Sequence, residues 1–333
     1  MTTLTTAVET PLARRGRENQ IIGRSGRPLL VIVEGTDIDA MIDAGIEVLG
    51  GLGRVLAGTR EVVLKPNTNQ RDPFPSTTAP ETIRAVARHL RAAGATRIAL
   101  HEDHKAELDL YYDPAALPGI EIQLSHSPSP DHYVLVEFDG WRGDAAPPLA
   151  QGEARGMMRM LQGGYTRTEG PRLRVARQLQ QAPVVINMPV LKRHFAGQIT
   201  SALKNNFGSV YGAHRWLAHS ALQTDRDYFD RKLAEFASAV RPELTITDVR
   251  ALQAVFGPNR QAGVTRIVDG VNKLILTGDM VAADAVALEI MKQHDDTFTA
   301  ENAAIVRRQF AHAEELGLGT SDLSRFEIIE IKV

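Results

Sequence analysis

The chain has 333 residues, 43% of them hydrophobic and 23% charged, and a formal net charge of -2 at pH 7. These values fit a globular protein with one large α/β domain or two smaller ones, and they argue against broad phosphate neutralisation on nucleic acid. The absence of cysteine excludes disulfides, cysteine nucleophiles and Cys-ligated zinc or iron–sulfur sites, and no apolar run approaches the ~18 residues that span a bilayer.

The first 28 residues contain Arg14 and Arg15 but no apolar segment after them, so they do not resemble an export signal. We expect a flexible polar arm at 1–28 and a single α/β domain at 29–333. A cytoplasmic protein without a membrane or nucleic-acid partner is the corresponding expectation, and the sequence leaves a homo-oligomer open.

The next hundred residues alternate between strand and helix patterns. Strands are predicted at 29–33, 61–64 and 97–100, and helices at 38–52 and 80–93. Such alternation is typical of parallel strands joined by right-handed crossovers. We therefore predict an α/β fold with a mixed, mainly parallel sheet flanked by helices.

Residues 102–170 are less regular. They hold two strand patterns, 120–124 and 133–138, before a stretch with many glycines and prolines, so we expect a cap or insertion here. Further along, helices are predicted at 227–240, 281–291 and 300–316, and strands at 244–248, 273–277 and 326–333.

The segment 184–208 holds the densest set of reactive side chains. A buried strand at 184–186 is expected to end at Pro189, because proline cannot continue a central ladder. Lys192 and His194 share one face if the chain after it is extended. The lysine charge favours a neutral imidazole, which suits a general base or a metal ligand. A basic surface loop is the alternative.

Two other groups are candidates for substrate binding. Lys65 and Asn67 follow a strand end, at the edge where open α/β sheets bind ligands. A helix-like stretch ends with three polar residues, Lys204, Asn205 and Asn206. Apolar residues flank them on both sides, and this pattern suggests the wall of a pocket. Lysine offers charge for a carboxylate or phosphate, and the amides offer donors and acceptors.

Acidic residues and further histidines suggest other roles. Asp248 ends a strand and is a candidate to orient the histidine or a lysine. His101, Asp103 and His104 follow another strand and, with His194, are candidate metal ligands, although their spacing matches no standard signature. No cofactor is predicted, and a divalent metal remains open.

Several familiar motifs are absent. The sequence has no phosphate-binding loop, dinucleotide fingerprint, nucleophile elbow or His-Glu-x-x-His motif. Nucleotide hydrolysis, standard dinucleotide binding and serine hydrolysis are therefore disfavoured.

An ordered set of segments resembles the family called domain of unknown function 362. These segments are LKPN at 64–67, PETIR at 80–84, INMPVLKRH at 186–194, ALKNNFG at 202–208, LTITD at 244–248, GDMVAADAVA at 278–287 and LGLG at 316–319. The resemblance implies an α/β fold and a prokaryotic origin, and little about activity. Relatives with a ferredoxin-type cysteine module look like iron–sulfur proteins, whereas this cysteine-free chain resembles a stand-alone member.

Three hypotheses follow for function. The leading one is a small-molecule enzyme of lyase or isomerase type that acts on an anionic or carbonyl-bearing metabolite by proton transfer, as in isomerisation, elimination or cyclisation. A biosynthetic pathway is the suggested context. His194, Lys192, Lys204 and Asp248 would be catalytic, and Lys65, Asn67, Asn205 and Asn206 would bind substrate. The alternatives are a metal-dependent enzyme, such as an oxidoreductase, and a non-catalytic metabolite-binding or accessory protein.

Overall fold

A computed structural model describes residues 18–68, 72–103, 112–125, 132–137, 172–222, 225–255 and 265–333. The predicted arm lies largely at 1–17, outside these residues, and so does most of the predicted cap. Within the described part of the arm, Ile21 is buried and its carbonyl accepts a hydrogen bond from the Leu29 N–H at 2.8 Å.

The described strands form an 11-stranded sheet and a separate two-stranded one. The main path runs in the order β13 (Glu327–Lys332), β1 (Leu29–Glu34), β12 (Lys273–Thr277), β10 (Leu244–Ala254), β7 (Val185–Met188), β2 (Glu61–Pro66), β3 (Arg97–Glu102) and β4 (Glu121–Leu124). Beside it, β8 (Val190–His194) and β11 (Arg266–Val268) pair with β10, and β9 (Gln198–Thr200) pairs with β8. The small sheet pairs β5 (Tyr133–Glu137) with β6 (Arg172–Ala176).

The predicted mixed, mainly parallel sheet is confirmed. Five neighbouring pairs on the main path are parallel, namely β13–β1, β10–β7, β7–β2, β2–β3 and β3–β4, whereas β12 runs antiparallel to both β1 and β10.

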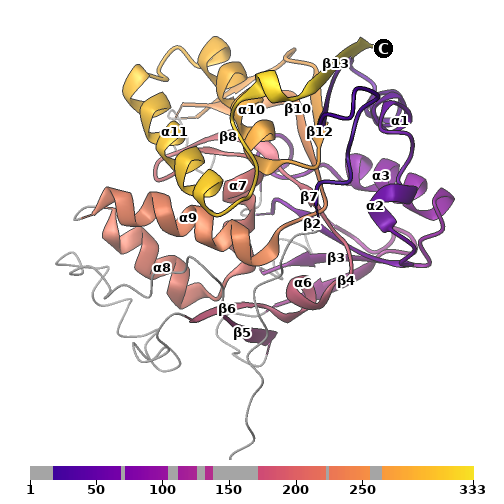
Figure 1. Ribbon diagram of the computed structural model, residues 1–333, viewed down its shortest axis with the longest axis horizontal. Helices are drawn as coiled ribbons and strands as arrows, with labels where there is room; N and C mark the ends of the chain where they lie inside the picture. The colour runs from indigo at the N-terminus through magenta and orange to yellow at the C-terminus, as the bar shows by residue number, and fades with distance from the viewer. Residues whose placement is uncertain are drawn as a thin grey trace, which may run out of the picture.

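Helices cover both faces of the sheet (Figure 1). One face carries α1 (Ile38–Val48), α2 (Gly53–Leu56) and α3 (Pro80–Ala92), and the other carries α7 (Ala202–Asn205), α8 (Gly212–Ala221), α9 (Arg226–Val240), α10 (Met280–His294) and α11 (Ala300–Glu315). A separate apolar core fills each interface, because successive strand residues point to opposite faces. The shorter pieces are α6 (Arg177–Gln181), η3 (Asn206–Ser209) and η4 (Leu323–Arg325). None of the described helices has the length and apolar character needed to cross a membrane.

The segment 184–208 differs from its prediction in two ways. Pro189 interrupts the strand but does not end the ladder, because β7 stops at Met188, β8 begins at Val190, and both pair with β10. The long β10 continues to Ala254, well beyond its predicted end, and so provides the second partner. The expected helix is only the four-residue α7 followed by η3, since the β8–β9 hairpin uses the residues before it.

Candidate functional site

Polar side chains replace the apolar core at the carboxyl ends of the central strands. Val63 and Val185 belong to one apolar core, whereas the next residues on the same face, Lys65 and Asn187, are polar and pair in register. The polar row continues into β10, where Thr245 pairs with Asn187. All three polar residues are buried. The sheet therefore has a polar edge where open α/β sheets bind ligands.

The Lys65 ammonium takes part in a buried ion pair. Its Nζ donates to Glu102 Oε2 at 3.0 Å and to the Pro66 carbonyl at 2.8 Å, and the Thr68 and Asp103 N–H groups also donate to this carboxylate. Burial acts to raise the pKa of Glu102, but the Lys65 charge and these hydrogen bonds lower it to about 2. The charge of Lys65, a predicted substrate ligand, is thus already balanced within the fold.

Lys192 begins a chain of buried amides. Its Nζ donates to Asn67 Oδ1 at 2.8 Å and to the Ser76 carbonyl at 2.6 Å. Asn67 Nδ2 then donates to Asn205 Oδ1 at 2.9 Å, and Asn205 Nδ2 donates to Asn187 Oδ1 at 2.7 Å. The chain connects β8, β2, α7 and β7. Asn67 and Asn205, predicted to bind substrate, therefore use their amides to hold Lys192 and one another.

The surroundings of Lys192 bring its pKa close to neutral pH. Both of its hydrogen-bond acceptors are uncharged carbonyl oxygens. Complete burial lowers the pKa of Lys192 to about 7, although the Glu102 and Asp72 charges act in the opposite direction. A neutral amine has two N–H groups, and both have acceptors here. Lys192 is thus accommodated in either protonation state near neutral pH.

Lys204 also lies apart from carboxylates in the described chain. Its Nζ is 3.9 Å from the centroid of the Phe207 ring, and part of its side chain reaches the surface. Burial of the amine, followed by the charges of Lys192 and Arg215, lowers the pKa of Lys204 to about 7. All the charged groups that shift this pKa are cations, so the amine lies in a positive local potential.

The tautomer of His194 is assigned from its hydrogen bonds. Its Nδ1 accepts the N–H groups of Ala196 at 3.0 Å and Gly197 at 3.2 Å, so the neutral ring carries its proton on Nε2. Burial, followed by the charges of Lys204 and neighbouring basic groups, lowers the pKa of His194 well below its ordinary value. In this tautomer the only lone pair faces backbone donors, an arrangement that does not favour the predicted role of general base. His194 can instead donate from Nε2.

Asp248 does not orient His194. It forms a bidentate ion pair with Arg250, with NH2 to Oδ2 at 2.8 Å and Nε to Oδ1 at 3.1 Å, and it accepts the Thr82 hydroxyl at 2.8 Å. The backbone of the β8–β9 turn performs the orienting role predicted for Asp248. We assign Asp248 to the contact between β10 and α3.

Asp284 is a positioning residue whose role the sequence did not reveal. From α10, it accepts the N–H groups of Ala202 at 2.6 Å and Leu203 at 3.0 Å, which fixes the start of α7. Burial raises the pKa of Asp284 to about 6 against the effect of these bonds. Asn206, predicted to bind substrate, donates from Nδ2 to the Ala202 carbonyl at 2.9 Å. Within the described structure its buried Oδ1 has no hydrogen-bond partner.

The predicted metal ligands are not assembled in the part of the chain that the structure describes. Asp103 accepts the Tyr133 hydroxyl at 2.5 Å and pairs with Arg215, and burial lowers the pKa of His101 to about 3. His104 lies outside the described residues. Among those that are described, no three His, Asp or Glu side chains are grouped so that they could hold a metal ion.

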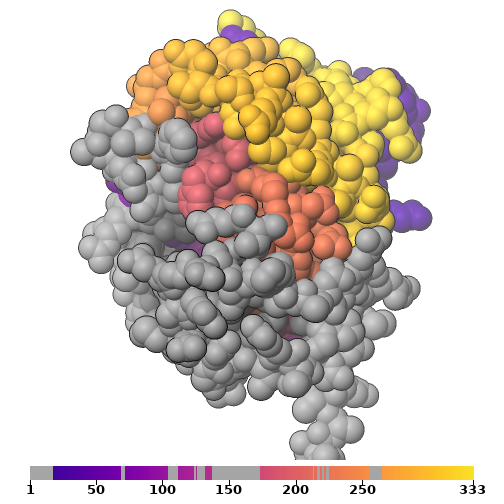
Figure 2. Space-filling view, turned by 90° about the vertical axis from the view of Figure 1, so that its left-hand side faces the viewer, coloured from indigo at the N-terminus to yellow at the C-terminus, as the bar shows by residue number. Residues whose placement is uncertain are grey.

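Aromatic rings around Lys204 were not predicted to form a site. The Phe207 ring lies 4.9 Å from His219, 5.7 Å from Phe229 and 4.9 Å from Phe236, measured between centroids. These residues come from α8 and α9, and no local pattern connects them with Lys204. Nearby, Phe195 is 52% exposed, and Figure 2 shows rose-coloured atoms from this part of the chain at the surface beside the yellow C-terminal helices. The Lys204 region therefore lies close to the surface.

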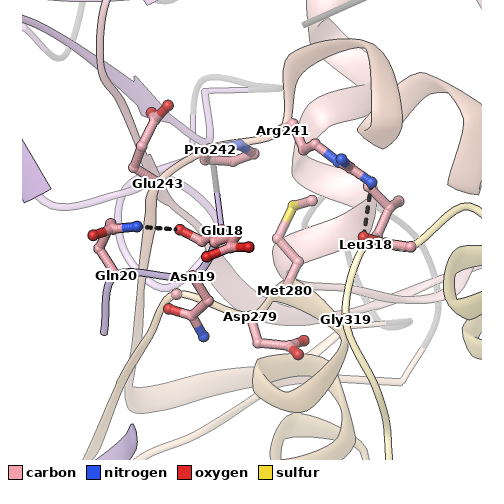
Figure 3. A pocket seen from close by; sticks show the side chains of 12 residues that line it. Glu18, Asn19, Gln20, Arg241, Pro242, Glu243, Asp279, Met280, Leu318 and Gly319 are labelled. Atoms are coloured by element: carbon pink, nitrogen blue, oxygen red, sulfur yellow. Dashed lines mark hydrogen bonds between the residues drawn. The ribbon is translucent and has the colours of Figure 1, made fainter. Parts of the chain in front are cut away.

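A separate cavity of about 300 Å³ contains two of the segments that carry the family resemblance (Figure 3). It is lined by Gly278–Met280, Gly317–Gly319, 241–243 and 18–20. Two of its polar side chains form hydrogen bonds that stabilise the fold. Asp279 accepts the N–H groups of Val281 and Ala282 at the start of α10, and Arg241 donates to two carbonyls after α11. We therefore place the candidate site at Lys192, His194 and Lys204.

Comparison with known proteins shows what the chain is similar to. Residues 151–289 match the family model described as a domain of unknown function, DUF362. The chain is also 28% identical over 255 residues to a thylakoid-associated protein of Synechocystis sp., covering 74% of this chain and 68% of that relative.

Two solved structures show distant similarity. The apoprotein of lactate racemase from Thermoanaerobacterium thermosaccharolyticum matches with 9% identity and a TM-score of 0.43, covering 79% of this chain and 59% of that one. A structural-genomics protein from Thermotoga maritima matches with 12% identity and a TM-score of 0.43, covering 78% and 60%. The chain thus spans about three fifths of each structure, and we draw no functional argument from either.

Proposed function

We propose that this protein is a small-molecule enzyme of lyase or isomerase type that transfers a proton on an anionic or carbonyl-bearing metabolite. The observation that carries the proposal is the environment of Lys204, which is partly exposed, lies against the Phe207 ring, and is influenced by cations rather than carboxylates. An amine that is neutral in part at pH 7 can accept a proton from substrate and return it.

The neighbouring groups have complementary roles in this proposal. Buried Lys192 contributes positive potential that favours an anionic substrate and keeps the neutral form of Lys204 populated. His194 donates from Nε2 to a substrate oxygen on which negative charge develops. The amide chain through Asn67 and Asn205 positions Lys192. Isomerisations, eliminations and cyclisations that proceed through an enolate can use this combination of a base and a hydrogen-bond donor to oxygen. A cytoplasmic location remains the prediction from the sequence.

Competitive acetylation of the folded protein tests this proposal without a known substrate. Trace acetic anhydride would be applied between pH 5 and 11, and each lysine peptide would be quantified by mass spectrometry. We expect Lys204 to titrate near pH 7, well below the 10.5 of an ordinary lysine. The exposed Lys332, whose pKa is raised by its hydrogen bond and ion pair with Glu34, serves as the control. A Lys204 titration close to that of Lys332 would refute the proposal.

A further inference from the structure

The β8–β9 turn brings Lys204 and His194 together. The Gly197 N–H donates to His194 Nδ1 at 3.2 Å, and a Cβ built on Gly197 would lie 3.4 Å from Lys204 Cδ. The lysine stem therefore passes over the same turn that fixes the imidazole. Because the turn occupies Nδ1, the His194 Nε2–H is the ring donor left for a substrate oxygen.

The environment of the Lys204 amine suits a nucleophile as well as a base. One side of Nζ faces the Phe207 ring, and that ring packs in turn on Phe229, Phe236 and His219. Burial lowers the pKa of His219 to about 3, so the imidazole adds no charge at neutral pH. Apolar surroundings and a neighbouring cation are the two features that activate lysine toward carbonyl carbon.

We propose that Lys204 forms a covalent imine with a 2-oxo acid, which deepens the proposed function and rests on it. The neutral amine nitrogen bonds to the carbonyl carbon, and His194 donates a hydrogen bond to the carbonyl oxygen. That oxygen leaves as water with the two protons of the amine, and a carbon–nitrogen double bond remains. No oxidant or reductant is consumed.

The carboxylate of a 2-oxo acid matches the charge around the site. The charge of Lys192 lowers the pKa values of both Lys204 and His194. Arg215 on α8 lowers the pKa of Lys204, and Arg226 on α9 lowers that of His194. Arg215 and Arg226 are paired with acids, whereas the hydrogen-bond acceptors of Lys192 are neutral. A bound anion favours the protonated form of Lys192, which a pKa of about 7 keeps within reach, and this coupling selects an anionic carbonyl compound over a neutral one.

Borohydride trapping tests this imine. The full chain would be incubated at pH 7 with pyruvate or with acetone, reduced with sodium borohydride and mapped by peptide mass spectrometry. The lower pKa of Lys204 leaves about 1,000-fold more neutral amine than at an ordinary lysine. We expect reduced pyruvate adduct at Lys204 at least about 10-fold above that at Lys292, and more adduct with pyruvate than with acetone.

Two variants complete the experiment. Lys204→Arg should lose the adduct while Lys292→Arg keeps it, and circular dichroism would check that each is folded. Adduct distributed among lysines according to their exposure would overturn the imine. If Lys204 titrates near pH 7 in the acetylation experiment but forms no pyruvate adduct, the imine is overturned and the proton-transfer function is left intact. A Lys204 that titrates near 10.5 would overturn both.

Discussion

Replacing Glu102 with glutamine should destabilise the protein in a manner that depends on pH. The carboxylate is almost fully buried with Lys65, and its pKa falls from an ordinary 4.5 to about 2. That difference corresponds to about 3 kcal/mol of stability contributed by the ionised group. Because the pKa is lowered on folding, the contribution is present above pH 4.5 and is lost as the pH falls toward about 2. At pH 3 about 2 kcal/mol of it should already have gone.

Urea denaturation of the wild type and Glu102→Gln between pH 3 and 7 measures this effect. We expect the variant to be less stable by about 3 kcal/mol at pH 7, and this difference to shrink steadily below pH 4.5. Glu61→Gln is the matched control, because Glu61 pairs with Arg97 at the surface, where both side chains are more than half exposed; its effect should stay below about 1 kcal/mol. A difference for Glu102→Gln that does not change with pH would refute the reasoning.

Three further outcomes follow from the structure. Asn205→Leu should cost about 2–4 kcal/mol in urea denaturation, because it leaves buried partners of the amide chain unsatisfied; a cost below 1 kcal/mol would contradict this. Gly319→Ala should lower the melting temperature, since its φ is +142° and a Cβ would lie 1.9 Å from Asp279 Oδ1, whereas Gly53→Ala, which meets open space, should not. Nitrogen-15 NMR of His194 should show a neutral Nε2–H tautomer from pH 5 to 8, and observation of the Nδ1–H form would disprove the assignment.

The local pattern of the sequence predicted most elements of the sheet and helices. Strands 29–33, 61–64 and 273–277 and helices 281–291 and 300–316 appear within a few residues of their predicted bounds. The spacing of apolar residues along the chain is visible in consecutive residues. A spacing of two places them on one face of a strand, and a spacing of three to four places them on one face of a helix. The position of Lys65 and Asn67 at the edge of the sheet follows from the same pattern, because both come just where the apolar run stops.

The order of the strands could not be obtained in this way. β1, β2 and β3 are successive in the chain, yet β12, β10 and β7 lie between β1 and β2. β7 pairs with β2, and β12 pairs with β1, across more than a hundred residues of sequence, and the local pattern holds no information on such distant partners. The antiparallel direction of β12 likewise has no local signal.

The chemical roles of the site residues depended on these distant contacts. The sequence placed Lys192, His194 and Lys204 in one region, but it did not show that Asn67 and Asn205 serve Lys192 or that the backbone occupies His194 Nδ1. It also gave no sign that Asp284 would hold the start of α7 from a helix about eighty residues later. A residue's identity fixes what it can donate, accept or ionise. Only the tertiary structure determines which partners it meets and how much water it loses, and these two factors decide its charge and its function.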